Sequence, residues 1–257
     1  RCRCLIALVG AGCARLPRMP AGLDGNPEPI RSEGRDQLLR SIAEEVEPVG
    51  GPRVLVGIDG RSGSGKSTFG DELAALLEER GATVVRSTID SFHRPRHERM
   101  RQGPASPDGY YEDSHQLAVV ASELLAPFQK GADEVLISAF DEPADRADRR
   151  VVSVPPEAVL VFDGLFLHRP ELVGFWDRSV VLHADRRCDA AWLAYLEGDL
   201  PDDPIARARV IDQRLERARW PRYRHGWQRY ADAVGWVETA IHIDNDDLAA
   251  PKVVPTP

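Results

Sequence analysis

A glycine-rich segment in the first third of the chain combines residue types that suit phosphate binding. Residues 60–67 read GRSGSGKS and match the pattern GxxxxGK[ST] at every fixed position. In such a loop the backbone N–H groups surround a polyphosphate, the lysine contacts the β and γ oxygens, and the serine hydroxyl binds Mg²⁺. The pattern predicts a site for ATP and Mg²⁺, with Lys66 catalytic and Ser67 on the metal. The predicted cofactor-binding residues are Gly60, Ser62, Gly63, Ser64, Gly65, Lys66, Ser67 and Thr68.

Two carboxylates lie at the ends of predicted strands and could complete this chemistry. Asp163 comes directly after AVLVF (158–162) and precedes a glycine, as a Walker B carboxylate does, so we expect it to hold Mg²⁺ opposite Ser67. Its alternative role is to cap the following turn. Asp90 ends the run ATVVRSTID (82–90). It could orient an attacking hydroxyl and accept its proton, make a second metal contact, or be a solvated loop acid.

The elements that must position these residues alternate along the chain. Apolar β-branched runs predict strands at 54–58, 82–90, 134–140, 150–154, 158–162, 179–183 and 240–244. Helical spacing predicts helices at 36–46, 68–80, 113–128 and 187–197, and a mostly helical segment at 202–236 that is broken near Pro221. Residues 91–111 read as a long polar loop. Strand–helix alternation of this kind predicts an α/β fold with a mostly parallel, doubly wound sheet, in which ligands sit beyond the carboxyl ends of the strands.

Composition limits the function classes. The chain has 257 residues, 42% of them hydrophobic, and a formal net charge of −8, which argues against an extended nucleic-acid surface. It contains no apolar run long enough to cross a membrane. Three of its four cysteines crowd the first 13 residues without zinc or disulfide spacing, which favours a reducing, cytoplasmic location. We expect residues 1–33 to be a disordered extension, with Met19 as the true start rather than a secretory signal before it.

Several motifs together resemble the uridine kinase and phosphoribulokinase group of P-loop kinases. They are GIDGRSGSGKST, TIDSFHRPR, the FDG after AVLV, and IDNDDLAAP, and the similarity runs from about Val54 to Pro251. The resemblance implies a nucleoside-kinase-like P-loop fold with a helical lid. It also implies that Asp90 is the base for the substrate hydroxyl, that Asp163 helps bind Mg²⁺, and that Asn245 lies near the adenine. We expect a kinase domain over 34–250 with its lid at about 186–228, followed by a tail at 251–257.

The same resemblance points to substrate residues. Positions that hold the nucleoside in such kinases correspond to Tyr110, Tyr111, Asp113 and His115, and a later RY..G.(Q)R.Y pattern includes Arg222. Arg94 could grip the nucleoside or a phosphate. The alternatives are a turn followed by an N-capped helix for residues 110–115, and a solvated loop for Arg94.

The predicted lid departs from the family pattern. Residues 188–198 read CDAAWLAYLEG and contain no arginine or lysine, although related kinases carry catalytic arginines there. Arg186 and Arg187, or the later arginines from Arg207 to Arg224, could replace them. Those later arginines could equally form an exposed face paired with acids such as Asp212 and Glu216.

These observations predict an ATP- and Mg²⁺-dependent kinase for a small-molecule hydroxyl. By resemblance, the acceptor is the 5′ hydroxyl of a nucleoside such as uridine or cytidine. The alternatives are a kinase for a sugar, pantothenate or nicotinamide riboside, and a nucleotide-binding regulator or slow NTPase. We expect no nucleic-acid or membrane partner, and a homo-oligomer is compatible with the resemblance.

Overall fold

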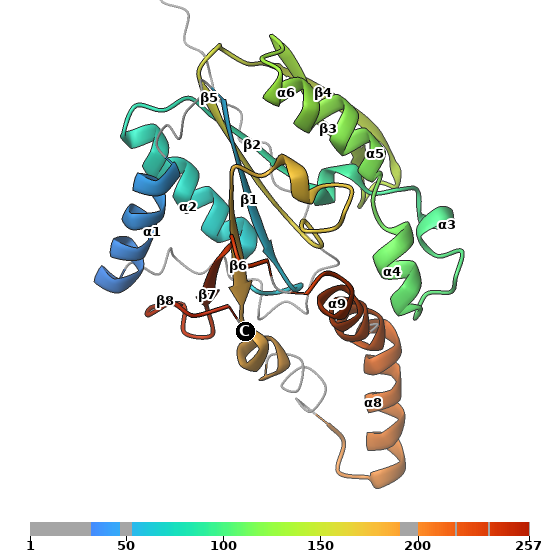
Figure 1. The fold of residues 1–257 in the computed structure, drawn as a ribbon. Helices are drawn as coiled ribbons and strands as arrows, with labels where there is room; N and C mark the ends of the chain where they lie inside the picture. Colours follow the sequence, from blue (N-terminus) through green and yellow to red (C-terminus); the bar gives the residue numbers. More distant parts are fainter. Residues whose placement is uncertain (1–31, 47–52, 191–199, 219, 236, 257) are drawn as a thin grey trace, which may run out of the picture.

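A computed structural model describes residues 32–46, 53–190, 200–218, 220–235 and 237–256. Its centre is a six-stranded sheet in the order β2-β5-β1-β6-β7-β8 (Figure 1). The first five strands in this order are parallel, and only β8 pairs antiparallel. The strands are β1 (Arg53–Gly60), β2 (Val84–Thr88), β5 (Ala158–Gly164), β6 (Arg178–His183), β7 (Ile241–Asp244) and β8 (Lys252–Val253). The predicted α/β fold with a mostly parallel, doubly wound sheet is therefore confirmed.

Alternating side chains of the central strands build a core on each face of the sheet. In β1, Val56 and Ile58 pack with the helices α1 (Glu33–Val46) and α2 (Lys66–Glu79), whereas Leu55 belongs to the opposite core. The side chains of the neighbouring β5 alternate between the two cores in the same way. Because both faces are covered, every residue of β1 and β5 is buried, as apolar runs in a parallel sheet require.

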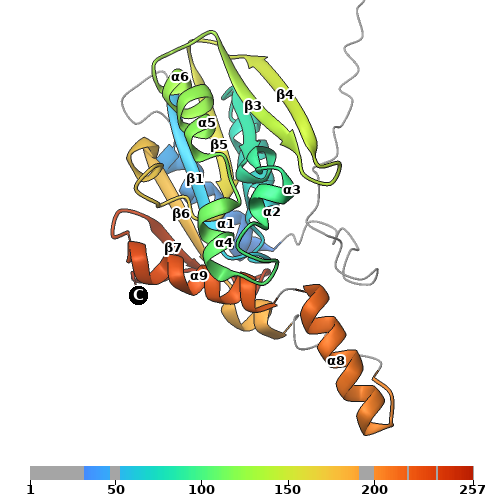
Figure 2. The same ribbon diagram turned by 90° about the vertical axis from the view of Figure 1, so that its right-hand side faces the viewer.

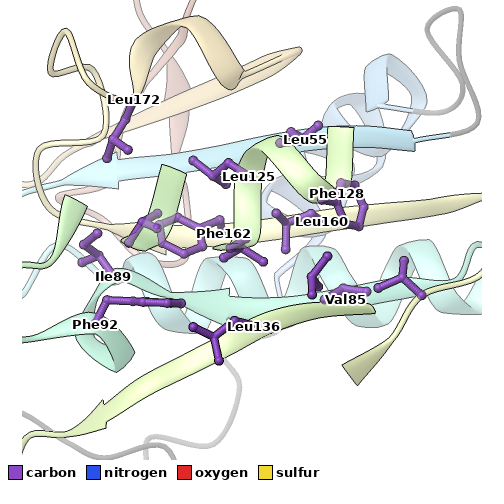
Figure 3. Close-up of a cluster of buried hydrophobic side chains, with 14 of the residues drawn as sticks. Leu55, Val85, Ile89, Phe92, Leu125, Phe128, Leu136, Leu160, Phe162 and Leu172 are labelled. Carbon is purple, nitrogen blue, oxygen red and sulfur yellow. The ribbon is translucent and has the colours of Figure 1, made fainter. Parts of the chain in front are cut away.

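The second core contains the cluster drawn in Figure 3, with Leu55, Phe128 and Phe162 among its labelled side chains. A continuous helical segment covers it, formed by α5 (Leu117–Val119), the π-helical η2 (Val120–Leu125) and α6 (Ala126–Gln129). Helical spacing predicted a helix at 113–128. The observed segment begins at Leu117, about one turn later than predicted.

The predicted polar loop at 91–111 is only partly a loop. It contains the second half of the 3₁₀ turn η1 (Ile89–Phe92), the short helix α3 (Arg96–Arg99) and most of α4 (Pro107–Asp113). The Ser106 hydroxyl accepts a hydrogen bond from the Gly109 amide at 3.0 Å, and Pro107 occupies the first turn of α4. Serine followed by proline is a strong helix start, and this signal outweighs the polar composition of the segment.

The hairpin that follows α6 and the end of the chain differ from the predicted arrangement. Residues 134–140 and 150–154 were predicted as strands, and they form a separate antiparallel hairpin of β3 (Glu134–Asp141) and β4 (Arg146–Ser153). The expected C-terminal tail includes the edge strand β8.

The C-terminal helices lie beside the carboxyl edge of the sheet. A helix starts at residue 185, two residues before the predicted helix at 187–197, and residues 191–197 of that prediction lie outside the described residues. The helices α8 (Pro204–Ala218) and α9 (Trp220–Val234) follow, and α8 extends away from the sheet in Figure 2. A short 3₁₀ turn, η3 (Val173–Phe175), precedes β6. Among the described helices, none is both long and apolar enough to cross a bilayer.

Candidate active site

The predicted phosphate-binding loop, residues 60–67, connects the end of β1 to the start of α2. Its glycines Gly60, Gly63 and Gly65 have φ angles of 155°, 84° and 90°, a range that side-chain-bearing residues rarely adopt. A Cβ atom on Gly60 would lie 2.6 Å from Ser64 Oγ. Glycine is therefore required both by the backbone conformation and by the close approach of the loop to itself.

The lysine and serine of the loop sit at the N-terminus of α2. Lys66 Nζ donates a hydrogen bond to the Arg61 carbonyl at 2.9 Å, so the ammonium group already lies under the loop. Burial lowers the pKa of Lys66, although the nearby Asp163 and Asp90 oppose this effect. Ser67 and Thr68 are at the helix N-terminus, where backbone N–H groups and the helix dipole favour an anion.

Asp163 lies near the end of β5, directly opposite this serine. Ser67 Oγ donates a hydrogen bond to Asp163 Oδ2 at 2.9 Å, and Arg86 Nη2 reaches Asp163 Oδ1 at 2.9 Å. Thr88 Oγ1 lies 3.5 Å from the same carboxylate. Burial raises the pKa of Asp163 against the attraction of Arg86 and Lys66. A hydroxyl beside a carboxylate is a donor set that suits Mg²⁺, so the residues present fit the predicted metal.

Asp90 lies in η1, two residues beyond the end of the neighbouring strand β2. His115 Nε2 is 3.9 Å from Asp90 Oδ1, and the rings of His115 and His93 stand 4.6 Å apart. Burial alone would raise the pKa of Asp90, but His115, His93 and Lys66 outweigh it and lower the pKa to about 2. Burial, together with the charge of His93, lowers the pKa of His115 to about 4. At neutral pH, Asp90 is therefore ionised and His115 is neutral.

Tyr110 and His115 are the predicted substrate residues whose polar atoms remain available. Tyr110 is 5% exposed and packs edge-on against Phe166 and Tyr223. Its hydroxyl is buried without a hydrogen-bond partner among the described residues, as is His115 Nε2. The Asp90 charge contributes to the raised pKa of Tyr110, after the larger effect of burial, which places the tyrosine within electrostatic range of Asp90.

The other predicted substrate residues already have protein partners. Asp113 is 2% exposed and forms an ion pair with Arg101. Tyr111 packs under the Arg169 guanidinium, which lies 4.1 Å from its ring centre. Arg222 donates to the backbone carbonyls of Ser106 and Arg99. Arg94 donates to the His115 carbonyl and pairs with Glu98 at 3.4 Å.

Asn245, which the resemblance placed near the adenine, anchors the phosphate-binding loop. It is fully buried, and its Nδ2 donates to the Ser64 carbonyl at 2.8 Å. Its Oδ1 accepts from Arg35 at 3.3 Å, and its own carbonyl accepts from Arg187 Nε at 3.3 Å. The side chain therefore joins the segment after β7 to the loop.

The helix at 185–190, where the predicted lid begins, contacts the same loop. Arg61 forms ion pairs with Asp185 at 2.8 Å and Asp189 at 2.9 Å, which tie the loop to the helix at 185–190. Arg187 Nη2 is buried, and the part of the chain that the structure describes offers it no hydrogen-bond partner. It would lie 3.7 Å from a Cβ atom on Gly65, so this guanidinium points toward the loop that would hold the phosphates. Arg186 is exposed and pairs with Asp246.

Asp59 was not singled out from the sequence, yet it has several buried hydrogen bonds. Its carboxylate is fully buried and accepts from the backbone amides of Phe166 and Leu167, both at 3.1 Å. It also accepts from the Tyr230 hydroxyl and lies 3.1 Å from His168 Nδ1. Burial would raise the pKa of Asp59, but these polar partners lower it overall. Asp59 thus joins the start of the phosphate-binding loop to the segment after β5 and to α9.

Sequence signals for the missed residues exist. Asp59 is an acid inside the apolar strand segment VGID, and Arg86 is a cation inside VVRST of β2. A charged residue in a buried strand requires a partner, so each position predicts a buried ion pair or hydrogen-bond network. The identity of the partners, however, depends on the tertiary fold.

Comparisons with known proteins agree with the fold. No protein-family model matches the chain. It is 27% identical over 163 residues to a uridine kinase of Leuconostoc citreum, covering 63% of this chain and 76% of that protein. It is 24% identical over 189 residues to a uridine kinase of Lactobacillus helveticus, covering 70% and 85%. A solved structure described as a possible uridine kinase from Bacillus stearothermophilus superposes with a TM-score of 0.57 at 22% identity, covering 78% and 91%.

The structural match establishes the fold, and the two sequence matches run over most of the kinases concerned. Together with the resemblance carried by the loop, the TIDSF segment and the FDG segment, they make the chain similar to P-loop kinases of small molecules. The chain is a distant homologue of the uridine kinases.

Proposed function

We propose that this protein transfers the γ-phosphate of ATP to a hydroxyl group of a small acceptor, in a Mg²⁺-dependent reaction. The observation that carries the proposal is the position of Asp90. It is an ionised carboxylate at the carboxyl end of the parallel sheet, within electrostatic range of the phosphate-binding lysine, Lys66.

The loop and its surroundings supply the nucleotide side of the reaction. Residues 60–68 would hold the phosphates through backbone N–H groups, and Lys66 would contact the β and γ oxygens. Ser67 and Asp163 would hold Mg²⁺, which supplies charge neutralisation on the phosphates when bound. Arg187 would donate from its buried Nη2 to an oxygen of the same phosphates, in place of the arginines that residues 188–198 lack.

Asp90 would act on the acceptor side. Its pKa of about 2 makes it a weak base in the ground state. Phosphoryl transfer has a loose transition state, in which the hydroxyl proton leaves late, so a weak base can still act. The main contribution of Asp90 would be to orient the hydroxyl for in-line attack and to accept its proton as the new bond forms.

The acceptor that the comparisons favour is a nucleoside, with uridine or cytidine at the 5′ hydroxyl as the first candidates. The Tyr110 hydroxyl and His115 Nε2 support this assignment, because each is a buried polar atom that a bound acceptor could satisfy. We propose these two residues, rather than the full predicted set, as the acceptor contacts.

A second acceptor class is favoured by the same geometry. Asp113 is already paired with Arg101, and Tyr111 is already covered by Arg169. With these two side chains engaged, a nucleoside base and ribose would have fewer partners than the resemblance implies. A smaller hydroxyl compound, such as a sugar, would need only Asp90, His115 and Tyr110.

The test is ADP release from Mg·ATP in the presence of a panel of nucleosides, sugars and other metabolite alcohols. Stimulation by uridine or cytidine supports the nucleoside assignment, whereas stimulation by another alcohol keeps the kinase and replaces the acceptor. ATP turnover that no acceptor stimulates, and that Asp90→Asn leaves unchanged while Lys66→Ala abolishes it, would identify a regulator or slow NTPase instead.

A further inference from the structure

Three side chains with metal-binding atoms meet beside the proposed acceptor site. Asp90, His93 and His115 each offer one ligand atom, and these atoms lie within 4.8 Å of one another. Two imidazole nitrogens and a carboxylate oxygen form a different donor set from the oxygen-only pair Ser67 and Asp163. Because its donor atoms differ, the cluster suits a different class of metal ion from Ser67 and Asp163.

The backbone holds the two histidines in place. His93 and His115 face each other in an isolated antiparallel bridge. On either side of it, the Arg94 amide donates to Ser114 O at 2.9 Å and the Gln116 amide donates to Phe92 O at 2.8 Å. The Gln116 side chain adds a hydrogen bond to His93 O at 2.7 Å. The segment after η1 and the segment after α4 are thus joined where the imidazole rings meet.

The tautomer of His93 is fixed in the form that a metal requires. His93 Nδ1 lies 2.8 Å from the Asp90 carbonyl oxygen. A carbonyl oxygen can only accept, so Nδ1 carries the proton and Nε2 presents its lone pair. A metal-binding histidine commonly has this arrangement, in which a second protein group orients the ring through its other nitrogen.

His115 supplies the observation that points to a missing ligand. The residue is 5% exposed, and its buried Nε2 has no hydrogen-bond partner within the described ranges, lying 3.9 Å from Asp90 Oδ1. His93 is 8% exposed, whereas the Asp90 side chain is 32% exposed. The cluster therefore has two enclosed nitrogen ligands and one side through which an ion or solvent can enter.

We propose that Asp90, His93 and His115 form a binding site for a divalent cation of the Zn²⁺ class, distinct from the predicted Mg²⁺ site. Zn²⁺ binds imidazole nitrogen and carboxylate oxygen at about 2.0–2.2 Å, so tetrahedral ligands stand about 3.3 Å apart. Closing the cluster around the ion needs side-chain shifts of about 1 Å, within the reach of small rotamer adjustments. Three protein ligands leave a fourth position for water.

The donor set selects against Mg²⁺. Imidazole nitrogen suits Zn²⁺, Co²⁺ and related transition metals, whereas Mg²⁺ prefers an octahedral shell of oxygen atoms. A bound Zn²⁺ would occupy the Asp90 oxygen that is proposed to orient the acceptor. Inhibition of phosphoryl transfer by Zn²⁺ would follow, and this consequence rests on the proposed function, whereas the binding of the ion does not.

The test is a Co²⁺ titration of the full chain after its metals are removed with a chelator. Tetrahedral Co²⁺ absorbs visible light, so one equivalent should produce a band that Zn²⁺ abolishes and Mg²⁺ does not. His93→Gln and His115→Gln should each weaken the apparent affinity by about 10–100-fold. The matched control is His97→Gln, which changes a histidine in the same segment that is 80% exposed and lies outside the cluster.

Two controls keep the result specific. Cys2, Cys4 and Cys13 could also bind Zn²⁺, so the titration is repeated after all three are replaced by serine, and the band should persist. Circular dichroism and thermal melting check that the histidine variants fold. The proposal is overturned if wild-type protein gives no band, if the band disappears with the cysteines, or if folded His93→Gln and His115→Gln bind Co²⁺ as tightly as wild type. Because the titration contains no ATP or acceptor, its outcome is independent of the proposed kinase activity.

Discussion

Ser67 Oγ and Asp163 Oδ2 lie 2.9 Å apart and share a hydrogen bond, although 96 residues separate them in the chain. The parallel pairing of β1 with β5 produces this contact, because it brings the carboxyl ends of both strands to one edge of the sheet. The hydroxyl and the carboxylate are thus positioned before any ion binds. Preorganised ligands reduce the reorganisation that metal binding would otherwise require.

Asp163→Asn should weaken the dependence of nucleotide binding on Mg²⁺. The amide oxygen can still accept from Ser67, so the loop should keep its shape, but the negative charge that favours the ion is lost. We expect Mg·ATP affinity to fall by about 10–100-fold, as for loss of a metal-binding group. Calorimetric titration with ATP in the presence and absence of Mg²⁺ measures the difference. If the ratio of the two affinities is the same as in wild type, Asp163 does not hold the ion.

Arg187→Ala should weaken ATP binding more than Arg186→Ala does. Arg187 Nη2 is buried beside Gly65 and has no partner among the residues that the structure describes, whereas Arg186 is exposed and paired with Asp246. We expect the KM for ATP to rise by about tenfold, the loss of one charge-assisted hydrogen bond. The adjacent Arg186→Ala removes the same charge from the surface and should leave the KM within about twofold of wild type. Equal effects of the two changes would contradict a phosphate contact by Arg187.

Tyr230→Phe should loosen the attachment of α9 to the nucleotide side of the sheet. The Tyr230 hydroxyl donates to the fully buried Asp59 and accepts from the His168 amide at 2.9 Å. Removing it leaves buried groups unsatisfied, at a cost of about 1–3 kcal/mol in the free energy of unfolding. Urea denaturation measures this loss, and hydrogen exchange should show faster exchange in α9. The exposed substitution Asp232→Asn in the same helix serves as the control, and equal losses in both variants would contradict the role of the network.

Much of the sheet could be predicted from residue patterns alone. AVLVF at 158–162 and VLVGI at 54–58 are apolar on both faces of the strand, which occurs when helices cover both sides. Asp163 could be found because it follows such a run, and Asp90 because it ends the predicted strand ATVVRSTID. Their distances to other groups depend on strand order, which a single sequence does not encode in any local pattern.

The acceptor region was less predictable for a physical reason. The type of residue at Asp113, Tyr111 and Arg222 suits a nucleoside, but each is engaged by another side chain or by a backbone carbonyl. Burial of Asn245 under the loop likewise follows from the packing of α1 against α2, which brings Arg35 to it. Such partners are chosen by tertiary structure, so the spacing of the residues could not reveal them.

Mild acid should weaken the contact between the adjacent strands β6 and β7. His242 Nε2 lies 3.1 Å from the Val237 carbonyl, so it carries the proton, and Nδ1 accepts from His183 Nε2 at 3.0 Å. Burial lowers the pKa of both histidines. The pKa of each histidine is therefore lower in the folded state than the value of about 6.5 in the unfolded chain. The two histidines then contribute fully to stability above about pH 6.5. This contribution is lost as the pH falls through the lowered values, because protonation places two N–H groups against each other.

We therefore expect the free energy of unfolding to fall between about pH 7.5 and about pH 5.5. His242→Asn should reduce that dependence, because one titrating group is removed. His225→Asn, at an exposed position of α9, should keep the wild-type dependence. Urea denaturation at the two pH values measures the difference in the free energy of unfolding for each protein. If this difference in His242→Asn equals that of wild type, the histidine pair is not the source of the pH dependence.

The most direct test of the proposed kinase activity is acceptor-stimulated ADP release from Mg·ATP by wild type and Asp90→Asn. We predict that at least one small alcohol, with uridine and cytidine tried first, stimulates wild-type turnover. Asp90→Asn should lower this stimulated rate by about 10²–10⁴-fold while calorimetric Mg·ATP affinity stays near wild type, because Asp90 acts on the acceptor. Stimulated turnover that survives in folded Asp90→Asn would contradict the role of Asp90 in phosphoryl transfer.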